Sequence, residues 1–413
     1  MTKPNQHYYS IWRNGQLHLL TDTLSPKVIQ DGTMVTDQHK IIWIGETSLL
    51  PKKFLSPQNI VHDLEQAVVT PGFIDCHTHV VFGGNRANEF RQRLEGVRYE
   101  EILAQGGGIY NTVKATRESS ETQLYQSAAK RVRQFLINGV TSFEIKSGYG
   151  LNLQTERKML RVARQLGQMG LDVTTTFLGA HVRAPEFQDN TQYITYLIED
   201  VLPELMNENL VDAVDAFCDQ VAFSADELKP LLEFANQNNL NIKIHTDQLS
   251  ASGGAVLASQ YKALSAEHLE YITEQDVKAM QESGMVAVLL PGAFYYLQES
   301  QRPNIDLLRQ YQIPIAIATD CNPGSSPCQS LLSIMNMACV LFRLTPFEVL
   351  KGVTCYAAKA LGWETSKGQL AVGYDADFVI WDCEQVDELV YFMGHSPCKK
   401  VIKKGTVIYE QST

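Results

Sequence analysis

Two histidines that stand two residues apart carry the clearest chemical signal in this sequence. His77 and His79 follow the apolar run 67–76. Alternate side chains of an extended strand point to the same face, so the two imidazoles would converge. Converging imidazoles are typical of half a metal site, and a pair of ordinary surface or core histidines is the alternative.

Further apolar runs end in groups that bind metals or carry protons. These groups are His181, His245, His268 and Asp320. Three imidazoles and one carboxylate suit a single Zn²⁺ or Fe ion that keeps an open position for water. The predicted metal ligands are His77, His79, His245 and Asp320.

Such an ion would lower the pKa of a bound water from about 15.7 toward about 7. Asp320 could then take a proton from the attacking water. His268, with an ordinary pKa near neutrality, would act beside it as an acid or a base. A second ion would need a bridging carboxylated lysine or a carboxylate on strand four. The segment 211–217 has no lysine. Its Asp215 could face inward, but we interpret it as a structural carboxylate, so one ion is predicted.

Short apolar segments that alternate with helical patterns must position these groups. Eight strands alternating with helices predict a (β/α)8 TIM barrel, with a doubly wound open sheet as the alternative. The helical patterns cover 122–137, 153–166, 225–236, 273–282 and 329–342. The expected strands are 67–76, 140–145, 172–178, 211–217, 241–245, 263–267, 285–290 and 313–318.

The two ends of the chain differ from this middle because they show short, alternating, strand-like runs. Examples are 40–45, 376–381 and 401–409. We predict a small β-sandwich module built from residues 1–66 and 366–413, beside a catalytic barrel of residues 67–365.

Composition excludes several classes of protein. A formal net charge of -11 argues against a broad nucleic-acid surface, and no apolar stretch is long enough to cross a membrane. Eight scattered cysteines and a polar N-terminus predict a cytoplasmic protein with reduced thiols, and Cys76 should be buried and face away from the two histidines. Because symmetric pairs are the commonest oligomers, a homodimer is expected.

At this point the chain resembles the amidohydrolase superfamily, through the histidines of strands one, five and six and the aspartate of strand eight. The resemblance covers essentially the whole chain. Its most specific segments are 82–86 (Phe-Gly-Gly-Asn-Arg), 106–109 (Gly-Gly-Gly-Ile), 144–151 (Glu-Ile-Lys-Ser-Gly-Tyr-Gly-Leu) and 320–325 (Asp-Cys-Asn-Pro-Gly-Ser). It implies Zn²⁺- or Fe³⁺-dependent hydrolysis of 4-imidazolone-5-propanoate to N-formimidoyl-L-glutamate, a step of histidine degradation.

The resemblance also implies a set of substrate contacts. Some members carry Glu where this chain has Gln248. A neutral amide cannot be a general base, so His268 and Asp320 are predicted to carry the proton, in an order that the sequence leaves open. The implied substrate contacts are Arg86, Tyr149, His181, Gln248 and Ser325, and the implied product contacts are Asn322 and Gly324.

These side chains suit a small anionic cyclic amide. Arg86 can grip a carboxylate with two hydrogen bonds, and His181 could bond the ring carbonyl and its developing oxyanion. Tyr149 offers a hydroxyl and an apolar face, or it simply packs the barrel mouth. Arg86 could instead pair with Glu89 on a surface loop. The run 106–108 is either a lid element or a turn.

Two other functions remain open from the sequence. A ring deaminase would share the metal ligands, but such enzymes usually place a Glu shortly after the strand-five histidine, where this chain has Gln248. A catalytically silent barrel would be a binding or assembly protein. Silent relatives tend to lose metal ligands, and all of them are present here.

Overall fold

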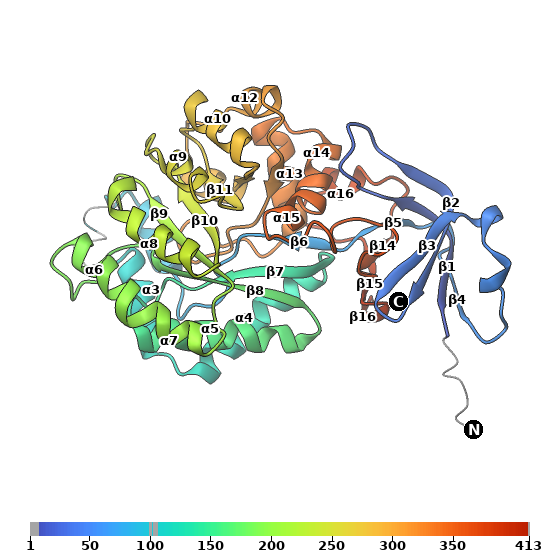
Figure 1. The fold of residues 1–413 in the computed structure, drawn as a ribbon, viewed down its shortest axis with the longest axis horizontal. Coiled ribbons are helices and arrows are strands. Elements are labelled where there is room, and N and C mark those ends of the chain that lie inside the picture. The colour runs from blue at the N-terminus through green and yellow to red at the C-terminus, as the bar shows by residue number, and fades with distance from the viewer. Residues whose placement is uncertain (1–7, 99–100, 102–105, 412–413) are drawn as a thin grey trace.

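Short parallel strands form a barrel in the computed structural model, which describes residues 8–98, 101 and 106–411 (Figure 1). Within these described residues the eight-stranded barrel sheet follows chain order from β6 to β13. The barrel closes where Thr78 and Cys321 form a parallel bridge and Thr319 donates hydrogen bonds to Asp75. The strands are β6 (Phe73–Asp75), β7 (Val140–Lys146), β8 (Asp172–Ala180), β9 (Ala213–Cys218), β10 (Asn241–Thr246), β11 (Ser265–His268), β12 (Val286–Leu289) and β13 (Ile315–Ile317).

The predicted barrel is confirmed, with one difference at its first strand. The segment 67–76 forms two strands, because the strand is interrupted at Gly72. A side chain there would collide with Thr141, and the Gly72 amide donates to the carbonyl of Asp377 instead of to a barrel strand. The first half of the predicted strand therefore belongs to another sheet.

Helices surround the barrel strands, and the predicted helical segments are confirmed. The predicted helix at 153–166 has the bounds of α5. Capping boxes fix the starts of α4 at Ser120, of α8 at Ser224 and of α10 at Thr273. The helices are α1 (Ala87–Leu94), α3 (Ile109–Glu118), α4 (Glu121–Leu136), α5 (Leu153–Leu166), α6 (Asn190–Tyr196), α7 (Leu202–Asn207), α8 (Ala225–Gln237), α9 (Gly254–Ser259), α10 (Glu274–Ser283), α11 (Pro291–Leu297), α12 (Ile305–Gln310), α13 (Leu331–Phe342), α14 (Pro346–Gly352), α15 (Cys355–Lys359) and α16 (Glu388–Tyr391).

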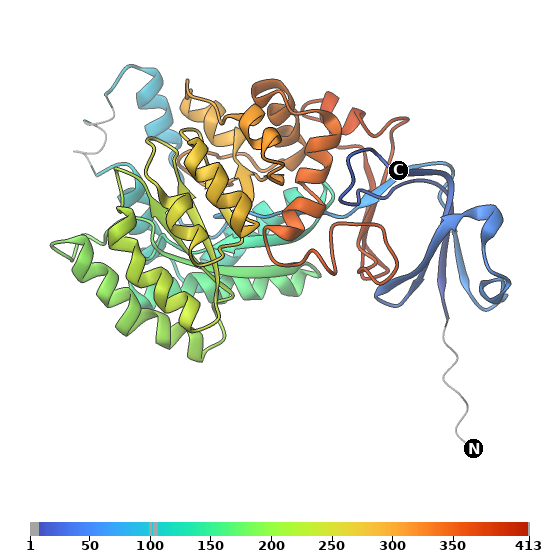
Figure 2. The same ribbon diagram turned by 45° about the horizontal axis from the view of Figure 1, so that its top comes forward.

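Both ends of the chain build the second sheet, which lies beside the barrel (Figure 2). Its centre is the antiparallel pairing of β14 with β5, so the two ends meet strand to strand. Trp12, Leu17 and Phe378 lie in its core. Its strands are β1 (Ser10–His18), β2 (Val28–Asp37), β3 (Lys40–Glu46), β4 (Ile60–Asp63), β5 (Val68–Pro71), β14 (Phe378–Trp381), β15 (Cys398–Lys403) and β16 (Thr406–Glu410).

A cluster of charged side chains joins this sheet to the barrel. We call it the junction cluster: Lys367, Lys403, Asp172, Asp375 and Asp377. Both ammonium groups contact Asp172, the first residue of β8, as well as Asp377 beside β14. Lys367 Nζ also lies 2.5 Å from an oxygen of Asp375. The cluster thus links a barrel strand to the C-terminal part of the chain.

Among the described residues, no helix has the length and apolar character needed to cross a membrane. The cysteines, all within the described residues, are free, and Cys76 is buried in an apolar cluster with Ile74 and Ala316. The predicted orientation of Cys76 away from the histidines is confirmed.

Candidate metal centre and active site

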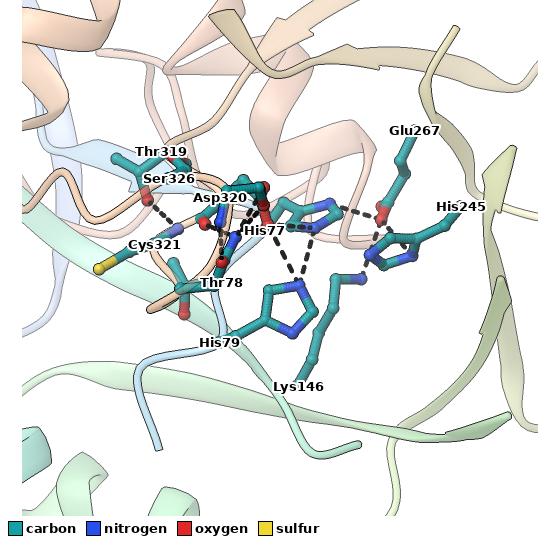
Figure 3. A network of polar contacts seen from close by, with 12 residues as sticks. His77, Thr78, His79, Lys146, His245, Glu267, Thr319, Asp320, Cys321 and Ser326 are labelled. Atoms are coloured by element: carbon teal, nitrogen blue, oxygen red, sulfur yellow. Dashed lines mark hydrogen bonds and ion pairs between the residues drawn. The ribbon is translucent and has the colours of Figure 1, made fainter. Parts of the chain in front are cut away.

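Side chains from the ends of separate barrel strands converge on one point (Figure 3). The Nε2 atoms of His77 and His79 lie 3.2 Å apart. Asp320 places Oδ1 3.3 Å from each of these nitrogens. His245 completes the group, because one ring nitrogen each of His77, His79 and His245 lies within 4.8 Å of the others.

This geometry fits one divalent cation. Two ligands bound at ~2.1 Å to one ion lie roughly 3.0–3.4 Å apart, which matches the 3.2 and 3.3 Å spacings. His245 Nε2 is buried and has no hydrogen-bond partner among the described residues. Because an unsatisfied buried polar atom is costly, His245 Nε2 suits a metal ion.

Carboxylates that lie behind His77 and His245 determine which ring nitrogen of each faces the centre. Glu267 Oε2 lies 2.6 Å from His77 Nδ1, and Asp215 Oδ2 lies 2.9 Å from His245 Nδ1. A carboxylate only accepts, so these close contacts favour a hydrogen on each Nδ1 and leave each Nε2 to face the ion. Burial works against protonation of His77, but Glu267 raises the pKa of His77 to about 9, so an ion that binds Nε2 would displace a proton from this ring.

Sequence reasoning missed most of the charges beneath these ligands. We call them the barrel cluster: Glu144, Lys146, Asp215, Lys243 and Glu267. All five side chains are fully or almost fully buried. Lys243 Nζ lies 2.7 Å from Glu144 and 2.8 Å from Glu267, and the main-chain oxygen of Cys76 accepts its third bond. Asp215, interpreted from sequence as structural, faces inward and contacts both His245 and Lys146.

The two predicted proton carriers, Asp320 and His268, differ in how many of their polar atoms already have a partner. Asp320 Oδ1 faces His77 and His79, and Oδ2 accepts bonds from Asn322 and Ser325. Although burial would raise it, these histidines hold the pKa of Asp320 well below its usual range. His268, in contrast, has a buried Nδ1 without a hydrogen bond among the described residues.

His268 departs from the expectation that its pKa is near neutrality. Burial, with the nearby His245 and His77, lowers the pKa of His268 to about 3, so its imidazole is neutral at pH 7. Its backbone φ of 78° is strained for a residue other than glycine, and its ring centroid lies 5.4 Å from that of His245. Glu270, itself buried, places a carboxyl oxygen 4.0 Å from His268 Nδ1.

His181 stands beside the centre with a defined tautomer. Its ring stacks on His79 with 5.6 Å between ring centroids, and Nδ1 lies 3.2 Å from the carbonyl oxygen of Gly148. A carbonyl cannot donate, so Nδ1 carries the hydrogen and Nε2 is an acceptor. Burial lowers the pKa of His181 well below its usual value. In this tautomer Nε2 accepts hydrogen bonds, whereas the predicted contact with the ring carbonyl would need a donor.

Arg86 lies against the loop that follows β13. A side-chain carbon at Gly324 would lie 2.3 Å from Arg86 Nη1, so a larger residue there would displace the guanidinium. Arg86 Nε donates to Thr112. The alternative pairing with Glu89 is not formed, because Glu89 accepts bonds from Gly108 and Asn111 instead.

The other implied contacts lie around the same mouth. Tyr149 is buried, and its ring lies 5.9 Å from that of His79. Gln248 is buried two residues beyond β10. Asn322 binds the amides of Gly324 and Ser325 and so shapes the loop. The run 106–108 forms the turn before α3, and residues 102–105 lie outside the described residues.

Comparison with known proteins agrees with this geometry. The amidohydrolase family model matches residues 68–408. The imidazolonepropionase of Cupriavidus taiwanensis is 50% identical over 399 residues, covering 96% of this chain and 95% of that protein. The imidazolonepropionase of Pseudomonas aeruginosa is 52% identical over 384 residues, covering 92% and 95%. The solved structure of E. coli guanine deaminase covers 98% of this chain and 100% of its own at a TM-score of 0.76 and 17% identity, a likeness of fold alone.

The barrel and its convergent histidines thus fit a hydrolase with a candidate metal centre, and the chain belongs to the amidohydrolase family. About half of its residues are identical to those of the curated relatives over nearly its whole length. The chain therefore belongs, within that family, to the imidazolonepropionases.

Proposed function

We propose that this site hydrolyses the ring amide of 4-imidazolone-5-propanoate and releases N-formimidoyl-L-glutamate. The observation that carries the proposal is the convergence of His77, His79 and Asp320, with His245, beside an arginine that could bind the substrate's carboxylate. In the reaction the bond between the carbonyl carbon and the adjacent ring nitrogen breaks. Water supplies the hydroxyl to carbon and the proton to nitrogen.

His77, His79, His245 and Asp320 would hold one Zn²⁺ or Fe³⁺ ion. When bound, such an ion lowers the pKa of water and polarises the carbonyl. Both oxygens of Asp320 are already engaged, so we assign the main proton transfer to His268. Its neutral imidazole would relay a proton from the attacking water to the departing nitrogen within the transition state, without being charged at rest.

The remaining side chains orient the substrate. Arg86 would bind the propanoate carboxylate with two parallel hydrogen bonds. His181 Nε2 would accept a hydrogen bond from a ring N–H, as its tautomer requires. Tyr149 and Gln248 would flank the ring, while Ser325 with Asn322 and Gly324 would form the wall that holds substrate and product.

The decisive experiment measures loss of the substrate's ultraviolet absorbance before and after treatment with a chelator. Activity should stop on chelation and return with Zn²⁺ or Fe. His77→Ala should lose both the ion and turnover, whereas His395→Ala, an exposed histidine, should keep both. Full turnover by a metal-free His77→Ala protein would contradict the proposal.

Metal analysis of the purified protein would separate zinc from iron, because imidazole and carboxylate ligands suit both. We further propose a cytoplasmic homodimer that acts on this small molecule in histidine degradation and binds no nucleic acid. Sedimentation of the purified protein tests the dimer. A single species at the 46.3 kDa mass of one chain would contradict it.

A further inference from the structure

Lys146 ends in a tripod of carboxylates directly beneath the metal ligands. Its Nζ lies 2.6 Å from Asp215 Oδ2, 3.0 Å from Glu267 Oε2 and 3.0 Å from Glu144 Oε2. The three carboxylates come from β9, β11 and β7, so the barrel itself assembles the tripod. Figure 3 shows the ammonium ending beside Glu267 and His245.

The tripod has the character of a cation site. Asp215, His245 and Glu267 each offer a ligand atom within 4.8 Å of the others, as in the predicted centre itself. Carboxylate oxygens are ligands of hard divalent ions, which bind them at roughly 2.0–2.2 Å. The Lys146 ammonium contacts two members of this group and therefore lies where a cation bound to both would lie.

We propose that Lys146 is a built-in cation that takes the place of a second metal ion and so keeps the centre mononuclear. The inference rests on the one-metal centre proposed above. Lys146 is a positioning residue in this account, since it acts through Asp215 and Glu267, the two carboxylates that orient His245 and His77.

Charge explains why a second cation would enter once Lys146 is removed. The barrel cluster holds two ammonium groups, Lys146 and Lys243, against three carboxylates. Without Lys146, three buried carboxylates would face Lys243 alone. Uncompensated buried charge is strongly unfavourable, so a divalent ion in the tripod would be stabilised.

Lys243 provides a matched control. It is buried in the same cluster and contacts Glu144 and Glu267, but its third bond goes to the carbonyl oxygen of Cys76. Its contacts do not include Asp215. Lys243→Met therefore removes the same charge at a point that does not open the tripod.

The experiment titrates metal-free protein with Mn²⁺ and counts bound ions by equilibrium dialysis and electron paramagnetic resonance. Wild type and Lys243→Met should bind one ion per chain at saturation. Lys146→Met should bind two, with the spectrum of two coupled Mn²⁺ ions. Lys146→Arg, which keeps the positive charge, should bind one ion per chain, as wild type does.

Each outcome tests a different statement. If wild type binds no ion, the proposed function fails. If wild type binds one ion and a folded Lys146→Met also binds one, only the Lys146 inference fails. If Lys146→Met does not fold, wild type tests the inference alone: a second Mn²⁺ found on Asp215 and Glu267 by anomalous diffraction overturns it, and one ion at millimolar Mn²⁺ supports it.

Discussion

Two clusters of lysines and carboxylates lie in different parts of this molecule. The barrel cluster lies beneath the candidate metal ligands, whereas the junction cluster lies at the start of β8. In the junction cluster both oxygens of Asp172, Asp375 and Asp377 bind lysine or main-chain nitrogen. In the barrel cluster Asp215 and Glu267 bind histidines as well as lysines. Ion pairs of the same kind therefore join two sheets in the junction cluster and orient the metal ligands in the barrel cluster.

Among changes within the two clusters, Glu267→Gln is expected to have the largest effect on both activity and stability. This change removes the carboxylate that orients His77 and leaves Lys146 and Lys243 with fewer partners. Metal affinity and kcat/KM should fall by about 10- to 100-fold. The free energy of unfolding should fall by about 3 kcal/mol or more. Steady-state kinetics and urea unfolding of the metal-loaded protein measure both, and unchanged metal affinity would show that Glu267 does not orient His77.

Asp377→Asn should separate stability from activity. Asp377 is buried and binds Lys367, Lys403 and the amide of Lys404. The free energy of unfolding should fall by about 3 kcal/mol, while kcat/KM stays within about 2-fold at a temperature where the variant is folded. A loss of activity larger than the loss of folded protein would mean that the junction cluster also shapes the site.

The junction cluster should also make stability depend on acid pH. Burial would raise it, but Lys403 and Lys367 hold the pKa of Asp172 well below its ordinary 3.8. A lowered folded-state pKa gives stability that is present above pH 3.8 and is lost as the pH falls toward the folded value. Between pH 5 and pH 3 wild type should lose more stability than Asp172→Asn, by on the order of 1 kcal/mol. Equal pH slopes in urea unfolding would contradict this.

The smallest effect is expected where an ion pair is exposed. Arg91 and Glu95 pair across one turn of α1, with about half or more of each side chain exposed. Glu95→Ala should change the free energy of unfolding by less than about 0.5 kcal/mol, because solvent screens the pair. Thermal unfolding measures this, and a larger loss would show that burial is not what distinguishes the clusters.

The sequence predicted the ligands better than their supports. His77, His79 and His245 could be found because parallel barrel strands gather their ends at one face. The barrel cluster leaves a weaker signal in the sequence. In that signal a charged residue stands two positions from a second charged or metal-binding residue, so both lie on the same face of a strand. Glu144 and Lys146 have this spacing, and so do Lys243 and His245.

Partners, tautomers and strand breaks required the three-dimensional structure. Lys243 and Glu144 are 99 residues apart, and only the strand order brings them together. The acceptor tautomer of His181 follows from its contact with Gly148, which no spacing indicates. The break at Gly72 depends on Thr141, a residue of the next barrel strand.

The pairing of β5 with β14 has a consequence for how the protein is made. A ribosome delivers β1 to β5 first, and residues 72–377 must follow before β14 can take its place beside β5. During that interval the edge of β5 offers unpaired main-chain groups to any other extended chain. The growing chain is therefore most exposed to wrong pairing and aggregation while the barrel is still being synthesised, and β14 closes that edge only afterwards.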